Sequence, residues 1–311
     1  MPPFTHLTLA LVAGVLLDRL LGEPRRYHPL VGFGTLATWL ERRLNRPGHR
    51  IARGALAWAL AVLPWVLAAA WLRVHGGLLA IAIDVGLLWF ALGARSLVEH
   101  AHAVAVPLQA GDLAEARRRV GWIVSRDTAA LNPTQVAAAG TESVLENGND
   151  AIFGTLFWFL VAGGPGAVLF RLANTLDAMW GYRTERYLHF GRLAARVDDV
   201  LGWLPARLTA LSYALLGHTR HALHCWRHQG PGWKSPNAGP VMAAGAGALR
   251  VQLGGEAPYH GAMTQRPPLG SGSAPDANSL FAAIALVNRS LALWIGISLL
   301  AGAIAWGLPH A

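Results

Sequence analysis

Residues 151–170, with the sequence AIFGTLFWFLVAGGPGAVLF, decide the fold class of this chain. The run holds no charged side chain and has the roughly 20 apolar residues that a helix needs to cross a bilayer. Gly163, Gly164, Pro165 and Gly166 lie inside it and would break a helix there. We therefore expect a broken or re-entrant helix near Gly163 that returns the chain to the same face, shielded by protein. One ordinary kinked span is the alternative, because membrane helices tolerate glycine and proline.

The composition of the whole chain points to a membrane protein. Of its 311 residues, 53% are hydrophobic and 14% are charged, and the mean hydropathy is +0.35. A soluble enzyme carries far more charge on its surface. Further candidate spans are the apolar runs at 7–21, 54–72, 76–94 and 291–308, with 200–216 a less certain one. We predict an all-α, polytopic integral membrane protein with a single domain over residues 1–311.

Basic residues set the expected topology. The formal net charge is +9, yet no segment resembles a recognition helix or an aromatic RNA-binding platform, so we expect no nucleic-acid partner. Arginines beside apolar runs favour the cytoplasmic side of a membrane. We place the catalytic segments 95–150, 171–199 and 230–275 on that side, since one crossing by 151–170 would leave the arginines of 171–199 outside. The connection after the first span is also cytoplasmic, because it carries Arg25, Arg26, Arg42, Arg43, Arg46, Arg50 and Arg53. The turn between the second and third spans lies at Arg73, His75 and Gly76.

An acidic series precedes the central apolar run. Glu142, Glu146 and Asp150 recur at four-residue intervals, and no Lys, Arg or His lies between them. Uncompensated carboxylates are costly unless a cation lies among them or their pKa values rise, and both conditions are typical of an active site. We expect a helix from Pro133 to Gly148 that carries the two glutamates on one face, with Asp150 in the turn that follows. A solvated acidic face is the alternative.

Arg126, Asp127 and Thr128 form a compact polar triplet upstream of that helix. Asp127 could orient the guanidinium of Arg126, and an oriented arginine binds phosphate or carboxylate through its bidentate fork. A local capping motif explains the same spacing.

A second polar segment follows the apolar run. Adjacent aspartates can hold Mg²⁺ through oxygen ligands while a nearby arginine binds phosphate, although surface ion pairing explains them equally well. The residues of interest are Asn174, Asp177, Tyr182, Arg196, Asp198 and Asp199.

Histidines occur in two places. His28 could bind phosphate or transfer a proton, although a lone histidine more often makes a structural hydrogen bond. His218, His221, His224 and His228 fall within about a 120° arc of a helix. We expect this group to face a membrane surface and not a metal ion, because arginines interleave with it and no carboxylate is near.

The remaining signals are weaker. Ser235, Asn237 and Gly239 open a tract of small residues that runs to Gly255. No phosphate-loop signature occurs anywhere, so a nucleotide would be bound in another way. Cys225 is alone and no intrachain disulfide can form.

Together these segments resemble the CobD/CbiB family of adenosylcobinamide-phosphate synthases, membrane proteins of cobalamin biosynthesis. The resemblance runs from the first apolar run to about residue 270. Its most specific parts are Arg126-Asp127-Thr128, the stretch from Glu142 to Asn147 with Asp150, Asn174 to Asp177 with Met179, Gly181 and Tyr182, Ala195 to Asp199 with Pro205 to Thr209, and Ser235 to Gly239. Two departures are small: the family often has aspartate at Glu23 and glycine at Ser125.

The resemblance implies a ligase that forms an amide bond. It would join (R)-1-amino-2-propanol, or its O-phosphate, to a propionate of adenosylcobyric acid, with ATP and Mg²⁺ required, no permanently bound cofactor, and the corrinoid as substrate. The implied catalytic residues are Glu142, Glu146, Asn147, Asp150, Arg126 and Asp127. Substrate would be bound by His28, Thr128, Asn174, Asp177, Tyr182, Arg196, Ser235, Asn237 and Gly239. Metal ligands would be Glu146, Asp150, Asp198 and Asp199.

Within that set, Glu142 is our candidate for the base that keeps the amine neutral, although Glu146 could exchange roles with it. The family also implies a multi-pass protein of the bacterial inner membrane whose active site faces the cytoplasm. Its partners would be the lipid bilayer and other late-pathway membrane enzymes. The alternative is a transporter or an ampE-type sensor without ligase activity, for which Asp84 inside an apolar run and the break at Gly163 would be suited.

Overall fold

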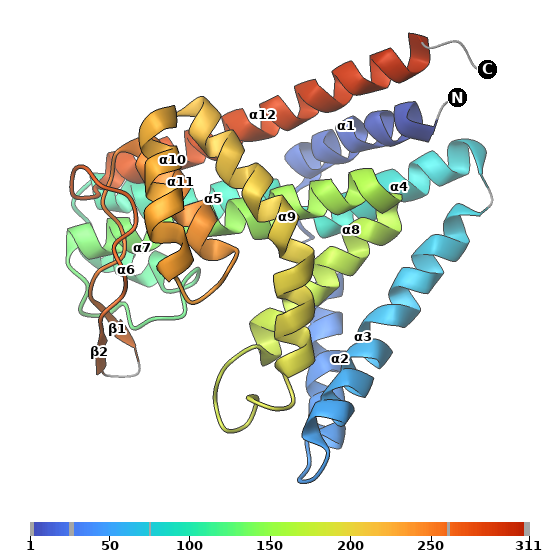
Figure 1. Ribbon diagram of the computed structural model, residues 1–311, viewed down its shortest axis with the longest axis horizontal. Coiled ribbons are helices and arrows are strands. Elements are labelled where there is room, and N and C mark those ends of the chain that lie inside the picture. Colours follow the sequence, from blue (N-terminus) through green and yellow to red (C-terminus); the bar gives the residue numbers. More distant parts are fainter. Residues whose placement is uncertain (1–2, 25–27, 75, 260–261, 308–311) are drawn as a thin grey trace. The chain divides into compact units, whose positions relative to one another are not determined.

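The computed structural model describes residues 3–24, 28–74, 76–259 and 262–307, and is almost entirely helical there (Figure 1). Arg25, Arg26 and His75, which we used to assign topology, lie outside the described residues. The helices before the central run are α1 (Pro3–Leu21), α2 (Pro29–Leu44), α3 (Arg50–Arg73), α4 (Gly77–Ala91), α5 (Ala94–Gln109), α6 (Leu113–Val120) and α7 (Pro133–Asn147). The π-helix η1 (Gly148–Phe153) leads into α8 (Gly154–Trp180), followed by α9 (Arg192–Leu216), α10 (Thr219–Gln229), the 3₁₀ turn η2 (Gly230–Gly232), α11 (Ala238–Leu249) and α12 (Ala277–Gly307).

The all-α prediction is confirmed, with one small addition. Strands β1 (Ala257–Tyr259) and β2 (Ala262–Thr264) pair antiparallel, with Ala257 opposite Thr264. No motif in the sequence predicted this pair of strands.

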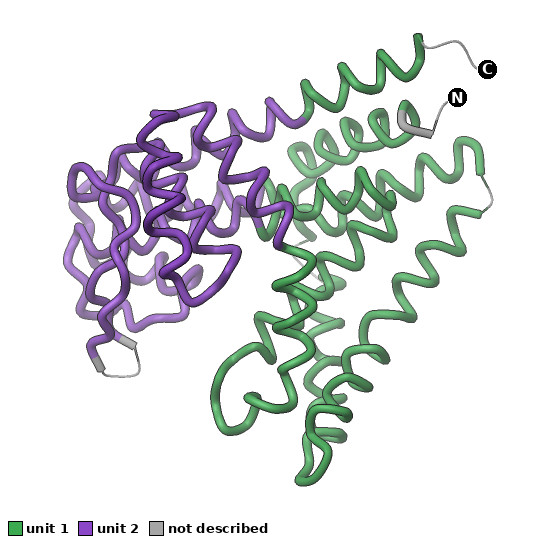
Figure 2. The backbone as a smooth tube through the Cα atoms, viewed as in Figure 1, with its two compact units in different colours: residues 1–94, 150–202, 295–311 green, residues 95–149, 203–294 purple. Residues whose placement is uncertain are grey.

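The chain forms two compact units, drawn separately in Figure 2. Unit 1 comprises residues 1–94, 150–202 and 295–311, and unit 2 comprises 95–149 and 203–294. The expectation of one domain over residues 1–311 stays a prediction.

Four helical stretches in the described part of the chain are long and apolar enough to cross a membrane: Arg50–Arg73, Gly77–Gln109, Pro133–Trp180 and Ala277–Gly307. They contain all or most of four predicted spans, and this is consistent with a polytopic membrane protein. The predicted spans 7–21 and 200–216 lie in α1 and α9, which are not among these stretches.

The helix break predicted near Gly163 is confirmed. Gly163 has φ 66° and ψ −153°, outside the helical region, and α8 doubles back there (Figure 1). The two arms lie against each other, since Phe170 packs at Gly154 and the Trp158 carbonyl lies at Gly166. The apolar residues before the break would extend only about 18 Å at 1.5 Å per residue, short of the roughly 30 Å hydrocarbon layer. The reversal therefore fits a re-entrant hairpin better than one kinked span.

A buried carboxylate supports the break. The side chain of Asp84 in α4 is fully buried and its Oδ1 accepts the backbone N–H of Gly164 at 2.8 Å. Arg73 Nε lies 2.8 Å from the same oxygen, and His6 Nε2 lies 3.4 Å from Oδ2. Asp84 thus caps the returning arm, whose first N–H groups have no partner within the helix.

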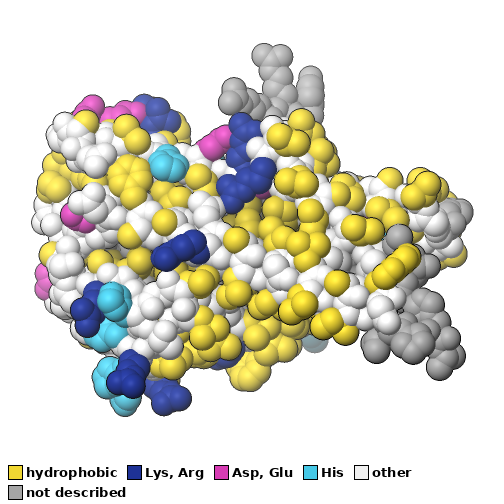
Figure 3. All heavy atoms as spheres, turned by 90° about the horizontal axis from the view of Figure 1, so that it is seen from above, with side chains coloured by type: hydrophobic (Ala, Val, Ile, Leu, Met, Phe, Trp, Pro, Cys, Tyr) yellow, Lys and Arg dark blue, Asp and Glu magenta, His cyan; other side chains and the backbone are white. Residues whose placement is uncertain are grey.

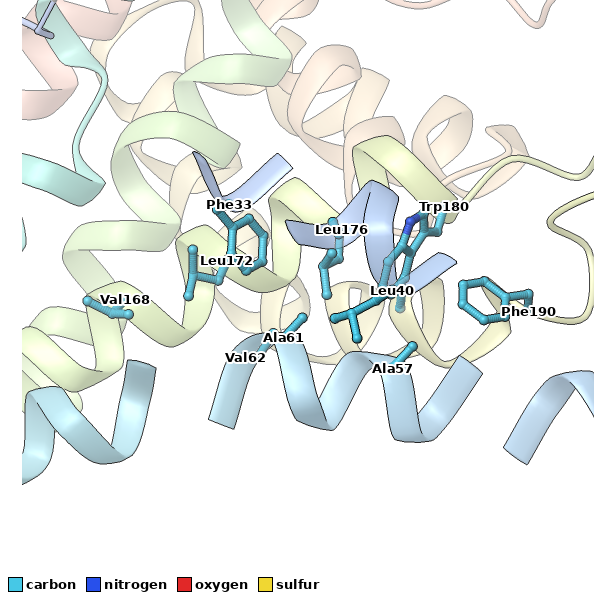
Figure 4. Close-up of a cluster of buried hydrophobic side chains, with 12 residues drawn as sticks. Phe33, Leu40, Ala57, Ala61, Val62, Val168, Leu172, Leu176, Trp180 and Phe190 are labelled. Atoms are coloured by element: carbon cyan, nitrogen blue, oxygen red, sulfur yellow. The ribbon is translucent and has the colours of Figure 1, made fainter. Parts of the chain in front are cut away.

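The core of unit 1 brings α2, α3 and α8 together (Figure 4). Helix α2 lies where we expected only a connecting loop, and it contributes Phe33, Ala37 and Leu40 at helical spacing. Trp180 and Phe190 stack edge to face with ring centroids 5.1 Å apart. This cluster holds the end of α8 against the first turns of α3.

Apolar side chains are also widely exposed. Figure 3 shows them spread over the helices of unit 1. On α3 the exposed stripe consists of Leu56, Leu60, Leu63, Leu67 and Trp71, and each of them is at least 43% exposed. Such a continuous apolar face is expected of a helix that contacts lipid.

Unit 2 has its own core, formed by α5, α6, α7 and α12. Val104, Val120, Val136 and Leu280 are fully buried in it. In α11, Gly245 lies against Leu145 and Gly247 lies against Ala222, so the small-residue tract allows close helix packing.

Candidate functional site

Four aspartates of unit 1 form the site's acidic cluster: Asp150 in η1, Asp177 in α8, and Asp198 and Asp199 in α9. Asn174 Nδ2 donates a hydrogen bond to Asp198 Oδ1 at 3.2 Å. Burial, followed by the charges of Asp150 and Asp177, raises the pKa of Asp198 to about 8. These residues come from three separate segments, so folding assembles a group of carboxylates that repel one another. A bound cation would relieve that repulsion.

Arginines lie beside one edge of the acidic cluster. Burial raises the pKa of Asp199, while the nearby guanidiniums of Arg196 and Arg183 act to lower it. Arg196 is exposed, and Tyr182 is exposed in the loop between α8 and α9. The structure therefore brings Arg196 to Asp199, as the sequence suggested. It gives Tyr182 no buried contact that fixes a substrate role.

Arg171 is a cation of this site that sequence reasoning missed. Its Nη2 lies 3.8 Å from Glu23 Oε1, and its charge interacts with both Glu23 and Asp150. The turn that carries Glu23 is fixed by Trp89, whose Nε1 donates to the Gly22 carbonyl at 3.0 Å. Arg171 precedes Asn174 and Asp177 at three-residue steps, which places all three on one helix face. That spacing could have identified it.

His28 has a structural role at the start of α2. Its Nδ1 accepts the backbone N–H of Leu30 at 3.1 Å and caps the helix. Its Nε2 lies 3.6 Å from Glu23 Oε2. Because Nδ1 is the acceptor, the proton of the neutral ring is assigned to Nε2, which faces Glu23. His28 is therefore next to the Glu23–Arg171 pair, and its contact with substrate stays a prediction.

The expected turn at Gly148 is absent, and this part of the prediction was wrong. The start at Pro133 is confirmed by a reciprocal capping box between Asn132 and Gln135, but Gly148 is helical and the chain continues through η1. The Tyr213 hydroxyl donates to the carbonyl of Leu145, in the last turn of α7, at 3.1 Å. Tyr213 packs directly on Gly148, so the glycine provides space for this ring and does not end the helix. Asp150 accordingly projects from a helix and not from a loop.

Glu142 is not an uncompensated carboxylate, which corrects our interpretation of the acidic series. Its side chain is 3% exposed and forms ion pairs with Arg126 and Arg266 in unit 2. Arg266 is bidentate, with Nη1 2.7 Å from Oε2 and Nη2 3.0 Å from Oε1. The N–H of Gly254 also donates to Oε1 at 2.9 Å. Two guanidiniums stabilise the ionised carboxylate, so Glu142 is poorly suited to the role of general base.

We call Glu142, Arg126 and Arg266 the carboxylate clamp. Arg266 also donates from Nη2 to the carbonyl of Gly254 and from Nε to that of Gly255, at 3.1 and 3.2 Å. The clamp thereby fixes the loop around the β-hairpin to α7. Sequence reasoning missed Arg266, because nothing near it in the chain distinguishes it from a surface arginine.

Other predicted residues of unit 2 lie near the clamp's helix. Glu146 and Asn147 are half-buried in the last turn of α7, and Asn147 Nδ2 donates to the Ser143 carbonyl at 2.9 Å. Asp127 is exposed, and its backbone N–H donates to the Pro258 carbonyl at 3.3 Å. Thr128 is half-buried against Gly121. Their catalytic and substrate-binding roles stay predictions.

The Ser235–Asn237–Gly239 motif has local structural contacts. Ser235 Oγ accepts the backbone N–H groups of Asn237 and Ala238 at the start of α11. Asn237 is buried, and its Oδ1 accepts from Arg207 Nη1 at 2.8 Å. Gly239 lies against Trp233 with no space for a side chain. These contacts explain the residue types without a substrate, whose binding here stays a prediction.

No three His, Cys, Asp or Glu side chains within the described ranges converge closely enough to hold a metal ion by themselves. The histidines of α10 contact each other and the backbone nearby. The rings of His224 and His228 stack with centroids 4.3 Å apart, and His221 contacts Ser271. Figure 3 shows histidine and basic side chains gathered over α10. The metal roles predicted for Glu146, Asp150, Asp198 and Asp199 stay predictions.

Comparison with known proteins identifies a matching family and several similar proteins. It matches the family described as CobD/Cbib protein over residues 11–287. It is 58% identical over 310 residues to the Cobalamin biosynthesis protein CobD of Chromobacterium violaceum, which covers 97% of this chain and 99% of that one. The proteins of the same name from Stutzerimonas stutzeri and Halalkalibacterium halodurans are 57% and 38% identical, covering 94% and 91% of this chain and 97% and 92% of theirs. No solved structure matches the chain.

Proposed function

The chain belongs to the CobD/Cbib family of cobalamin biosynthesis proteins, and from that premise we propose that it is an adenosylcobinamide-phosphate synthase. In this reaction the amine of (R)-1-amino-2-propanol, or of its O-phosphate, forms an amide with a propionate carboxyl of adenosylcobyric acid. A carboxylate is a poor electrophile, so ATP would first transfer its γ-phosphoryl group to it, giving an acyl phosphate and ADP. The amine then displaces phosphate.

The acidic cluster of unit 1 is the observation that carries this proposal. Such a reaction gathers phosphate charge, and buried carboxylates with a raised pKa are typical of sites that handle charge. Arg183 and Arg196, which lie near Asp199, are placed to bind phosphate oxygens. Arg171, whose charge interacts with Asp150 inside the fold, would balance part of the cluster's negative charge.

The donor set of the cluster fits Mg²⁺. All candidate ligands are oxygens, and Mg²⁺ usually binds one or two carboxylates together with water and substrate phosphates. A site completed by substrate needs no three converging side chains, in keeping with their absence from the described residues. One or two of Asp150, Asp177 and Asp198 would hold the ion together with substrate phosphates, and the bound ion would neutralise phosphate charge. Asp198 would give up its proton on loading.

The carboxylate clamp has a different part in this proposal. Glu142 would position the loop at residues 254–266 through Arg266, and would not accept the proton of the amine. The base is then to be sought elsewhere. His28 does not provide it in the assigned tautomer, because Nδ1 accepts the Leu30 N–H and Nε2 carries the ring proton toward Glu23.

Membrane placement is part of the proposal. The arginines around the α2–α3 turn would lie on the cytoplasmic side of a bacterial inner membrane, and the acidic cluster would face the cytoplasm, where ATP is available. The bilayer and other late-pathway membrane enzymes would be its partners.

The transporter alternative began from Asp84 and the break at Gly163. Asp84 contacts Arg73, His6 and the N–H of Gly164, so it has a sufficient structural role in capping the hairpin. An ion pathway would require Asp84 to exchange these partners. A sensor of the ampE type would not depend on the acidic cluster.

A reconstitution assay tests the proposal. Purified protein is incubated with adenosylcobyric acid, aminopropanol phosphate, ATP and Mg²⁺, and the amide product and ADP are measured by mass spectrometry. Wild type and Asp112→Asn, which alters an exposed helix cap that asparagine fills equally well, should both give product. Asp198→Asn should not. Wild-type protein that yields no amide in this mixture, yet moves a corrinoid across vesicles, would support the transporter instead.

A further inference from the structure

The turn between α2 and α3 forms one strongly basic end of unit 1 together with the loop before α9. The two segments carry eight arginines against two acids, Glu41 and Glu185. We call seven of these residues the arginine end: Arg42, Arg43, Arg46, Arg50, Arg53, Arg186 and Arg192. The eighth, Arg183, is not included because it lies near Asp199. This surface is separate from the acidic cluster and has no part in the proposed reaction.

Specific contacts join the two segments. Arg186 binds the buried Glu41 with Nη2 2.6 Å from Oε2 and Nε 3.0 Å from Oε1, and this pairing lowers the pKa of Glu41. Asn45 Nδ2 donates to the Arg186 carbonyl at 3.0 Å, and Arg50 donates to the same carbonyl. Glu41 is thereby satisfied inside the fold. Arg42, Arg43 and Arg46 are exposed and face solvent.

A groove of about 570 Å³ opens at this end, lined by residues 48–52, Ala55 and His189. Its walls combine basic side chains, from His49, Arg50 and His189, with apolar ones, from Ile51, Ala52 and Ala55. Trp39 in α2 is 53% exposed, with the Arg43 guanidinium 5.5 Å from the centre of its ring. Exposed tryptophan next to arginine is typical of the level of lipid headgroups. The apolar stripe of α3 begins one turn further along, at Leu56.

From these observations we propose that the arginine end binds an anionic phospholipid, whose phosphate contacts the exposed arginines while its first acyl carbons lie along Ile51 and Ala55. Charge complementarity identifies the partner, because a zwitterionic headgroup would not balance so many uncompensated cations. Each basic side chain near an anionic membrane surface contributes about 1 kcal/mol of attraction. The proposal does not rest on the enzymatic function.

Lipid exchange with the full chain tests this proposal. The protein is placed in nanodiscs of phosphatidylcholine, alone or mixed with phosphatidylglycerol, and retained phosphatidylglycerol is measured by native mass spectrometry after release into detergent. The variant Arg42→Gln/Arg46→Gln removes two exposed arginines of the turn. We expect its affinity for phosphatidylglycerol to fall on the order of 30-fold, corresponding to two such charges. Raising the salt concentration should weaken wild-type binding in the same direction.

A matched variant gives the control. Arg220→Gln/Arg227→Gln removes two exposed arginines from α10, a basic helix of unit 2, and should retain wild-type binding. Equal retention of phosphatidylglycerol by wild type and both variants would overturn the proposal. So would a loss confined to the α10 variant, which would assign the lipid to that helix. Melting in phosphatidylcholine alone verifies that both variants are folded, and free glycerol phosphate should not compete with the lipid.

Discussion

The acidic cluster and the carboxylate clamp both hold carboxylates inside the fold, but only the clamp pairs its carboxylate with arginines. In unit 2 the carboxylate of Glu142 is buried away from water, and it is paired with two buried arginines, Arg126 and Arg266. In unit 1 burial, followed by the charges of Asp150 and Asp177, raises the pKa of Asp198 to about 8, and one amide hydrogen bond from Asn174 only partly opposes the rise. A paired carboxylate organises structure, whereas a cluster in excess of its cations stays ready to bind one. The series of acids at four-residue spacing thus contains groups with different tasks.

Removing the charge of Glu142 should have the largest effect on stability. Glu142→Gln leaves Arg126 and Arg266 buried without their carboxylate, and loss of one partner of a buried pair costs about 3–5 kcal/mol. We expect a lower midpoint in denaturant, followed by tryptophan fluorescence, and faster tryptic cleavage in the loop that Arg266 fixes. Glu99→Gln is the matched control, because its side chain is 55% exposed and paired only at the surface with Arg95. That change should cost at most about 1 kcal/mol. Equal losses in the two variants would remove the distinction between clamp and surface pair.

Neutralising Asp198 should separate activity from stability. Asp198→Asn replaces a carboxyl group whose ionised form the fold does not stabilise, so the protein should unfold at the same or a higher temperature. Amide formation should drop roughly 100-fold or more, because asparagine cannot supply the ionised carboxylate. The measurement pairs thermal unfolding with product formation in the same preparation. A variant that keeps wild-type turnover would show that the cluster does not serve the reaction. A variant that unfolds earlier than wild type would show that the ionised carboxylate is structural.

The pH dependence of stability should distinguish the two regions further. The folded-state pKa of Asp198, about 8, lies above the unfolded value of about 4. Its contribution to stability is therefore fully present below about pH 4 and is lost as the pH rises through about 8. We expect the melting temperature to fall by a few degrees over this range in wild type and less in Asp198→Asn. Mg²⁺ should reduce the fall, because it binds the ionised form. An identical pH profile in both proteins would place the Asp198 pKa near its usual value.

The sequence could predict the features that are determined by residues close together in the chain. The helix start at Pro133 was correct because Asn132 and Gln135 complete the capping box within four residues, and the break at Gly163 was correct because the glycines and proline lie at the break. The pairing of Glu142 could not be foreseen, since Arg126 and Arg266 are 16 and 124 residues away in the chain. Gly148 was misinterpreted as a helix end for the same reason, because Tyr213, which packs on it, is distant in the chain.

Long-range contacts also explain the missed elements. Helix α2 was expected to be a loop because its arginines dominated the topological argument, although Phe33, Ala37 and Leu40 already had helical spacing. For the acidic cluster, the sequence supplied Asp198 and Asp199 but not their relation to Asp150 and Asp177. That relation depends on the hairpin at Gly163.

Replacing Tyr213 should have the smallest effect on stability, because its buried contact involves no charged group, unlike those of the acidic cluster and the carboxylate clamp. Its hydroxyl donates to the Leu145 carbonyl, three residues before the π-helix η1. Tyr213→Phe keeps the ring against Gly148 but removes a buried hydrogen bond, which should cost about 0.5–1.5 kcal/mol, less than loss of the Glu142 charge. The cost should not vary between pH 5 and pH 8, since no group titrates in this contact, and denaturant unfolding at both pH values measures it. A pH-dependent loss would mean that the tyrosine acts on a titrating carboxylate, and the contrast between charged and neutral support of this helix would have to be abandoned.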